Sequence, residues 1–89
     1  MNKHYHLIGI GGIGMSGIAR LLLKSGEKVS GSDLKESKIT EELKNLGAQV
    51  FIGHDSGNIS GATSVIYSTA IKEDNPEIVE AKRHGIALL

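Results

Sequence analysis

The chain has 89 residues, a formal net charge of zero and no cysteine. This length favours one small domain, the neutral charge argues against nucleic-acid binding as the main task, and the missing thiols exclude disulfides and thiolate metal sites. Aromatic residues make up only 3% of the sequence, so we expect an aliphatic core. No run approaches the roughly 20 apolar residues that span a bilayer, and the first residues lack the pattern of a secretory signal, so we expect a cytoplasmic protein.

The first part of the chain predicts a strand, a helix and a second strand, at residues 4–10, 14–26 and 28–33. The first strand, HYHLIGI, becomes continuously apolar toward its end. In the helix, apolar side chains recur at the three- and four-residue spacing of an amphipathic helix. They are Met15, Ile18, Ala19, Leu22 and Leu23. Lys24 in the last turn and Gly26 just after it are typical of a helix C-terminus.

The middle of the chain predicts a second helix and two more strands. Ile39, Leu43 and Leu46 lie on one face of a helix over residues 37–47, which Gly47 ends. A third strand follows at residues 48–53. A polar loop with room for one helical turn then leads to a fourth strand, SVIYS.

The last helix has strong signals at both ends. Asn75 is a good cap, Pro76 suits the first helical position, and Glu77 favours the positive end of the helix dipole. Basic residues crowd its last turn before Gly85 ends it, and a fifth strand, IALL, closes the chain.

The elements alternate between strand and helix, and the strands are mostly apolar. This order predicts an α/β fold, a Rossmann-like open parallel sheet of about five strands with helices on both faces. We expect residues 1–89 to form one domain, and the apolar last strand suggests that it is the N-terminal part of a longer protein.

A glycine-rich loop joins the first strand to the first helix. Gly9, Gly11 and Gly14 form G-x-G-x-x-G in a strand–turn–helix context, where this motif binds phosphates. Gly9 would allow the tight turn, Gly11 would let the backbone approach a phosphate, and Gly14 would let the helix pack close to the strand. Free amides around Ile13 to Ser16 would then face the anion. The plain alternative is a glycine turn that serves only packing, and the lysine of an ATP-binding Walker A loop is missing.

Four other residues follow strands at the edge where ligands of open α/β sheets bind. Asp33 lies 19 residues after Gly14, where dinucleotide-binding folds place an acid on a ribose. His54 follows the third strand, and Ser68 and Thr69 follow the fourth, where their hydroxyls could bond a base or a sugar. Each also has a plain interpretation: a solvated loop side chain or a turn and capping role. We give His4 and His6 little weight as metal ligands because no third ligand is evident.

Four segments together resemble the N-terminal domain of the Mur ligases: HLIGIGGIGMSGIA, VSGSD, LGAQVFIGH and STAIKEDNPEIVEA. Within that family the resemblance is strongest to the branch that joins L-alanine to UDP-N-acetylmuramic acid. It implies a domain that binds the UDP part of this nucleotide, with the diphosphate in the glycine loop and Asp33, His54 and Ser68 near the nucleotide. The candidate substrate-binding residues are therefore Gly11, Gly12, Ile13, Gly14, Met15, Ser16, Asp33, His54, Ser68 and Thr69.

The resemblance also implies that the chemistry happens elsewhere. The complete ligase would use ATP and Mg²⁺ through an acyl phosphate, in a central domain whose Gly-Lys-Thr loop this chain lacks, so we expect the 89 residues alone to be inactive and to bind no cofactor. Two alternatives stay open. One is an NAD-binding module of a dehydrogenase or nucleotide sensor, and the other is a related ligase that recycles muropeptides. The block STAIKEDNPEI favours a ligase over the NAD module.

Overall fold

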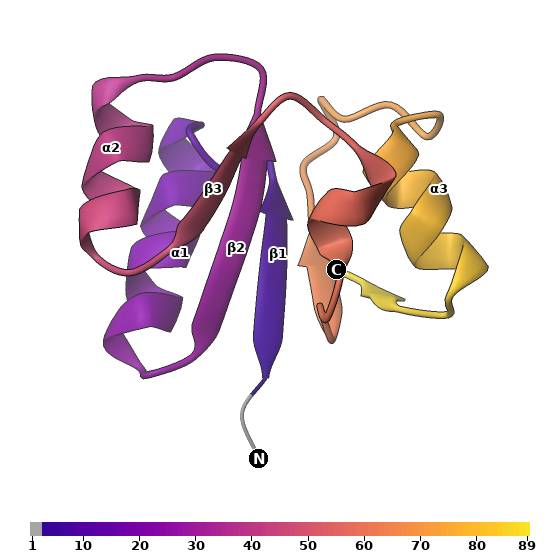
Figure 1. Cartoon of the computed structure of the whole chain (residues 1–89), viewed down its shortest axis with the longest axis horizontal. Coiled ribbons are helices and arrows are strands. Elements are labelled where there is room, and N and C mark those ends of the chain that lie inside the picture. The colour runs from indigo at the N-terminus through magenta and orange to yellow at the C-terminus, as the bar shows by residue number, and fades with distance from the viewer. Residues whose placement is uncertain (1–2) are drawn as a thin grey trace.

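The computed structural model describes residues 3–89 and contains a five-stranded parallel sheet (Figure 1). The strands are β1 (His4–Ile8), β2 (Lys28–Asp33), β3 (Gln49–Ile52), β4 (Ser64–Ile66) and β5 (Ala87–Leu88). The helices are α1 (Ile13–Lys24), α2 (Lys38–Asn45) and α3 (Pro76–Arg83), with a short 3₁₀ turn, η1 (Ser56–Ile59). The α/β fold and the one-turn segment are confirmed.

The strand order is β3-β2-β1-β4-β5, so the direction of winding reverses between β1 and β4. In Figure 1, α1 and α2 lie over the β2–β3 half of the sheet, and α3 lies at the β4–β5 half. Ligands of open parallel sheets bind at such a reversal, beyond the carboxyl ends of the strands. The fold therefore directs attention to the loops that follow β1 and β4.

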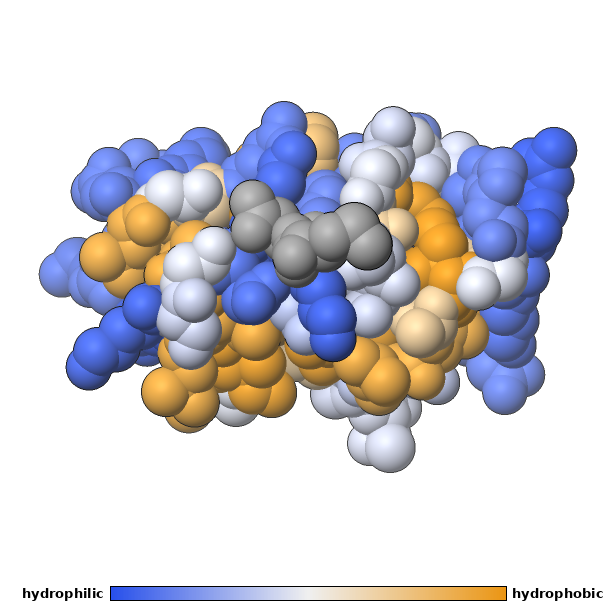
Figure 2. Space-filling model, turned by 90° about the horizontal axis from the view of Figure 1, so that it is seen from below, coloured by the Kyte–Doolittle hydropathy of each residue, from blue (hydrophilic) through white to orange (hydrophobic). Residues whose placement is uncertain are grey.

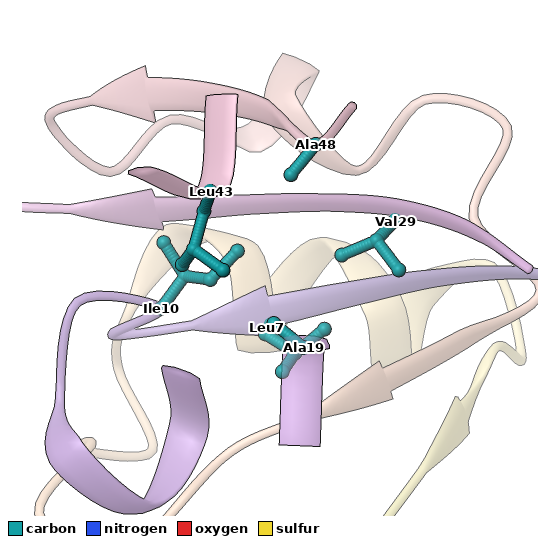
Figure 3. Packing of buried hydrophobic residues seen from close by; sticks show 6 residues of the cluster. All are labelled: Leu7, Ile10, Ala19, Val29, Leu43 and Ala48. Carbon is teal, nitrogen blue, oxygen red and sulfur yellow. The ribbon is translucent and has the colours of Figure 1, made fainter. Parts of the chain in front are cut away.

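Two aliphatic clusters pack on opposite faces of the sheet. The cluster under α1 and α2 consists of Leu7, Ile10, Ala19, Val29, Leu43 and Ala48, all labelled in Figure 3. The cluster under α3 and η1 consists of Ile8, Ile59, Ala62, Val65, Ile78 and Ala81. Because β1 contributes Leu7 to one cluster and Ile8 to the other, the central strand is covered on both sides.

Several boundaries differ from the sequence-based expectation. β1 ends at Ile8 rather than at residue 10, because Gly9 takes a left-handed φ of 79° and turns the chain out of the sheet. β4 and β5 are also shorter than expected. Ile18 and Leu46, expected on the buried faces of their helices, are 39% and 56% exposed. No helix within residues 3–89 has the length and hydropathy needed to cross a membrane.

The two ends of the sheet differ in what surrounds them. Figure 2 looks onto the end at which the strands begin, where hydrophilic side chains lie at both flanks and hydrophobic patches lie between them. The strands end on the other side of the molecule, and the glycine loop lies there.

Candidate nucleotide site

The glycine loop is held against the end of β2 by backbone hydrogen bonds. The amides of Gly9 and Ile10 both donate to the carbonyl of Ser32, at 2.8 and 3.0 Å. The amide of Gly12 donates to the carbonyl of Gly9 at 2.9 Å, which closes the turn just before α1. The loop is therefore fixed before any ligand arrives.

The first turn of α1 has unused amides. Its cap residue, Gly12, has no side chain to accept a hydrogen bond, and no acidic residue lies in the turn. Within residues 3–89, the amides of Ile13, Gly14 and Met15 have no hydrogen-bond acceptor. Such amides at the positive end of a helix dipole bind anions. The turn thus leaves three backbone amides free to bind an anion.

Asp33 lies next to this turn and makes a bond that the sequence did not predict. Its Oδ2 accepts from the amide of Gly11 at 2.9 Å, and its Oδ1 accepts from the amide of Leu34 at 2.8 Å. A Cβ on Gly11 would lie 2.8 Å from Oδ2 of Asp33 and 3.1 Å from Cγ2 of Thr40. In this structure, therefore, Gly11 lacks a side chain because Asp33 and Thr40 approach it closely.

Gly14 has a different role from the one that was expected. A Cβ built there meets nothing within 4 Å, so the prediction that Gly14 allows close packing of helix and strand is wrong. Gly14 instead faces a hollow of about 540 Å³ beside the loop. The lining is Gly9, Gly12, Gly14, Met15, Ile18, Asp33, Ile66, Tyr67, Ser68, Ala70 and Ile71. One end of the hollow thus offers amides and the rest is mostly apolar, which suits a phosphorylated ligand with an apolar or aromatic part.

The predicted site residues divide into two groups. Gly12, Gly14, Met15, Asp33 and Ser68 line the hollow, and Ser68 also makes a local turn because its Oγ accepts from the amide of Ala70 at 3.3 Å. The other five do not line it: Gly11, Ile13, Ser16, His54 and Thr69. Among these, the buried Ser16 donates its hydroxyl to the carbonyl of Ile13 at 3.0 Å, and Thr69 is exposed.

His54 lies in a neighbouring, smaller hollow of about 260 Å³. Both hollows include Ala70 and Ile71, so they adjoin. The ring is mostly buried, with 15% of the side chain exposed, and its Nδ1 lies 2.8 Å from Oγ of Ser32. His54 is therefore at the predicted edge of the sheet, but beside the glycine-loop hollow rather than in it.

Sequence reasoning missed the buried polar network behind His54. Glu77, at the start of α3, is fully buried and accepts from Nε2 of His6 at 2.6 Å and from the hydroxyl of Ser32 at 2.7 Å. It also accepts from the side chain of Asn58 at 2.9 Å and from the amide of Asp55 at 3.1 Å. A carboxylate with this many donors stays ionised in the interior.

The pKa of Glu77 reflects two opposing effects. Burial by itself would raise this pKa, but the hydrogen bonds from His6, Ser32 and Asn58 outweigh it and lower the pKa to about 2. The network continues along the sheet, since Ser30 lies 2.7 Å from both Nδ1 of His6 and Nε2 of His4. Burial lowers the pKa of His4.

A signal for this network was present in the sequence. His4 and His6 alternate along β1, Ser30 and Ser32 alternate along β2, and the register places His6 beside Ser30. Both pairs point to the face under α3, because side chains two residues apart lie on the same side of a strand. Two adjacent strands with polar residues on one buried face require a polar partner, and α3 provides Glu77.

Comparison with known proteins places this geometry in a family. The model of the Mur ligase family, catalytic domain, matches residues 4–89. The chain is 58% identical over 87 residues to a UDP-N-acetylmuramate–L-alanine ligase of Aquifex aeolicus, and this match covers 98% of the chain but 19% of that protein. A second such ligase, of Persephonella marina, is 57% identical over 84 residues, which are 94% of this chain and 18% of that protein.

A solved structure agrees with these sequence matches. The crystal structure of the UDP-N-acetylmuramate–alanine ligase MurC from Thermotoga maritima superposes with a TM-score of 0.92 at 38% identity, over 96% of this chain and 20% of that one. The chain thus spans about a fifth of the length of the curated relatives it matches. The match to the family model extends over almost the whole chain, and the chain belongs to the Mur ligase family.

Proposed function

We propose that this chain binds the UDP part of UDP-N-acetylmuramic acid, as the N-terminal domain of the ATP-dependent ligase that adds L-alanine to that nucleotide. The observation that carries the proposal is the uncapped first turn of α1, whose amides at Ile13, Gly14 and Met15 face no acceptor and adjoin Asp33. The identity of 57–58% to relatives named UDP-N-acetylmuramate–L-alanine ligase supports this choice of nucleotide.

The geometry suggests how the nucleotide would lie. The diphosphate would accept hydrogen bonds from the free amides of α1, where the helix dipole stabilises negative charge. The mostly apolar remainder of the hollow, including Tyr67 and Ile71, would take a less polar part of the ligand. Asp33 would act next to the diphosphate mainly by holding Gly11, and so the loop, in place.

The bond-forming step would lie outside these residues. In the proposed cytoplasmic enzyme, other domains would hold ATP and Mg²⁺ and activate the lactyl carboxylate for attack by L-alanine. Anchoring the UDP end would position the reactive end, because binding energy from remote parts of a substrate lowers the entropic cost of reaction. This chain would therefore contribute substrate affinity and orientation.

Calorimetric titration of the chain with UDP-N-acetylmuramic acid, UDP and NAD tests the proposal. We expect both uridine nucleotides to bind and NAD to bind at least about tenfold more weakly, a difference of about 1.4 kcal/mol. Tighter binding of NAD than of UDP would point to a dinucleotide module and refute the proposal. A chain that binds neither uridine nucleotide, while circular dichroism shows it folded, would refute it as well.

A further inference from the structure

The buried network determines where its protons lie. Glu77 is ionised, so it only accepts hydrogen bonds, and its Oε1 lies 2.7 Å from Oγ of Ser32. A serine hydroxyl has a single proton, and the buried carboxylate is the strongest acceptor that it contacts. Ser32 therefore donates to Glu77 and has only lone pairs left for other partners.

This arrangement fixes the protonation of the His54 ring. Oγ of Ser32 lies 2.8 Å from Nδ1 of His54, and because Ser32 can only accept there, Nδ1 must carry the proton. Oε2 of Glu77 lies 3.5 Å from the same nitrogen and favours a proton there too. In a neutral imidazole only one nitrogen is protonated, so Nε2 of His54 presents a bare lone pair.

Nε2 of His54 is open to the outside. It has no hydrogen-bond partner within residues 3–89. In that part of the chain every fully buried side-chain nitrogen or oxygen has a partner, so Nε2 is not fully buried. Nε2 is therefore reachable from solvent, on the side of the ring away from Ser32. His54 itself lines the hollow that adjoins the glycine-loop site at Ala70 and Ile71.

The start of α3 holds Glu77 in the required position. Asn75 caps the helix, its Oδ1 accepting from the amide of Glu77 at 2.9 Å, and Pro76 occupies the first helical position. On its other side the carboxylate is held by Asn58 and by the amide of Asp55, which follows His54 directly. Four separate donors thus orient one carboxylate beneath His54.

We propose that Glu77, acting through the hydroxyl of Ser32, is a positioning residue that holds His54 as its Nδ1–H tautomer and so presents Nε2 as a hydrogen-bond acceptor to a ligand that extends from the glycine-loop hollow into the adjoining one. The ligand group that meets His54 is then a donor, an N–H or O–H of the nucleotide. This ligand role rests on the proposed function. The tautomer itself does not, because the network exists without ligand.

Nitrogen NMR of the ligand-free, ¹⁵N-labelled chain tests the tautomer directly. At about pH 8.5, where an ordinary histidine is neutral, the wild-type His54 ring should show a protonated Nδ1 and an unprotonated Nε2. In Ser32→Ala and in Glu77→Gln, the ratio of Nδ1–H to Nε2–H should fall about tenfold, as expected for the loss of one buried hydrogen bond. A wild-type ring that is mainly Nε2–H would overturn the proposal.

A matched control lies one turn further along α3. Glu80 bonds the surface residue His84 at 3.0 Å, so Glu80→Gln makes the same chemical change without touching the buried network. It should leave the His54 signals unchanged. A Ser32→Ala chain that keeps the wild-type ratio would refute the relay through Ser32, and this variant remains informative if Glu77→Gln does not fold.

A second titration separates the two proposals. If wild type binds UDP and Ser32→Ala binds it more weakly by about tenfold while Glu80→Gln does not, the acceptor role of His54 is supported. Equal UDP affinity in wild type and Ser32→Ala, with an altered tautomer, would overturn the ligand role alone. If the wild-type chain does not bind UDP but does show the Nδ1–H form, the proposed function is refuted and the tautomer assignment stands.

Discussion

Replacing Gly14 by alanine should separate ligand binding from folding. Gly14 is in the first turn of α1 and faces the hollow, and an added Cβ there meets no protein atom within 4 Å. The fold should therefore tolerate the methyl group, and the higher helix propensity of alanine should raise the free energy of unfolding by up to about 1 kcal/mol.

Binding should respond in the opposite direction. The methyl group would occupy space in front of the free amides, where the diphosphate is proposed to lie. Loss of one charge-assisted hydrogen bond costs about 1.5–3 kcal/mol, so the affinity for UDP should fall by about 10- to 100-fold. Calorimetric titration measures the affinity, and urea unfolding followed by circular dichroism measures the stability.

Gly17→Ala is the matched control. Gly17 lies three residues further along α1, its added Cβ also meets nothing within 4 Å, and it does not line the hollow. This variant should gain similar stability and keep wild-type affinity. The reasoning is refuted if Gly14→Ala binds UDP as tightly as wild type, or if both variants lose affinity equally.

Three further predictions concern the loop, the sheet and the network. Asp33→Ala removes the carboxylate that accepts from the amides of Gly11 and Leu34. Hydrogen exchange at the Gly11 amide should therefore accelerate and the free energy of unfolding should fall by about 1–3 kcal/mol; unchanged exchange at Gly11 would contradict the tether. Gly31→Ala would place a Cβ 2.5 Å from Cδ1 of Ile10 and 2.7 Å from the carbonyl oxygen of Leu7. This overpacking should lower the free energy of unfolding, measured by urea denaturation, by about 1–3 kcal/mol. An unchanged free energy of unfolding would show that β2 can shift to make room for the methyl group. Because the folded-state pKa of Glu77, about 2, is below the ordinary value of 4.5, its stabilisation is complete above pH 4.5 and is lost as the pH falls toward 2. The loss should be about 3 kcal/mol, and Glu77→Gln should remove this part of the acid dependence; an identical acid profile in the variant would argue against it.

Local patterns accounted for the elements and the fold. Helical spacing, cap residues and glycines located all three helices, and the alternation of strand and helix predicted the parallel sheet with helices on both faces. The glycine loop between β1 and α1 was also predictable, because its glycines, strand and helix are contiguous in the sequence. Exposed Ile18 and Leu46 were misplaced, since apolar spacing shows which side chains share a face but not how far a neighbouring element covers it.

The contacts made between distant segments were not predictable in the same way. Glu77 looked like an ordinary first-turn acid, and only the folded chain brings it to His6, 71 residues earlier in the sequence. The role of Gly11 depended on Asp33, which reaches back from the next strand. In both cases strand order and register determine which side chains meet, and the sequence predicts the type of sheet but not its exact register.

The polar face of β1 and β2 also constrains how the chain could be redesigned. Sliding β2 by one residue would turn Ser30 and Ser32 into the aliphatic layer beneath α1, and a slip of two would separate Ser32 from Glu77. Each mispaired arrangement would leave buried donors or acceptors unmatched, at about 1–3 kcal/mol apiece. Replacing all of these polar side chains by aliphatic ones would remove this cost of mispairing. A redesigned domain would then have a higher free energy of unfolding but a less strictly defined strand register.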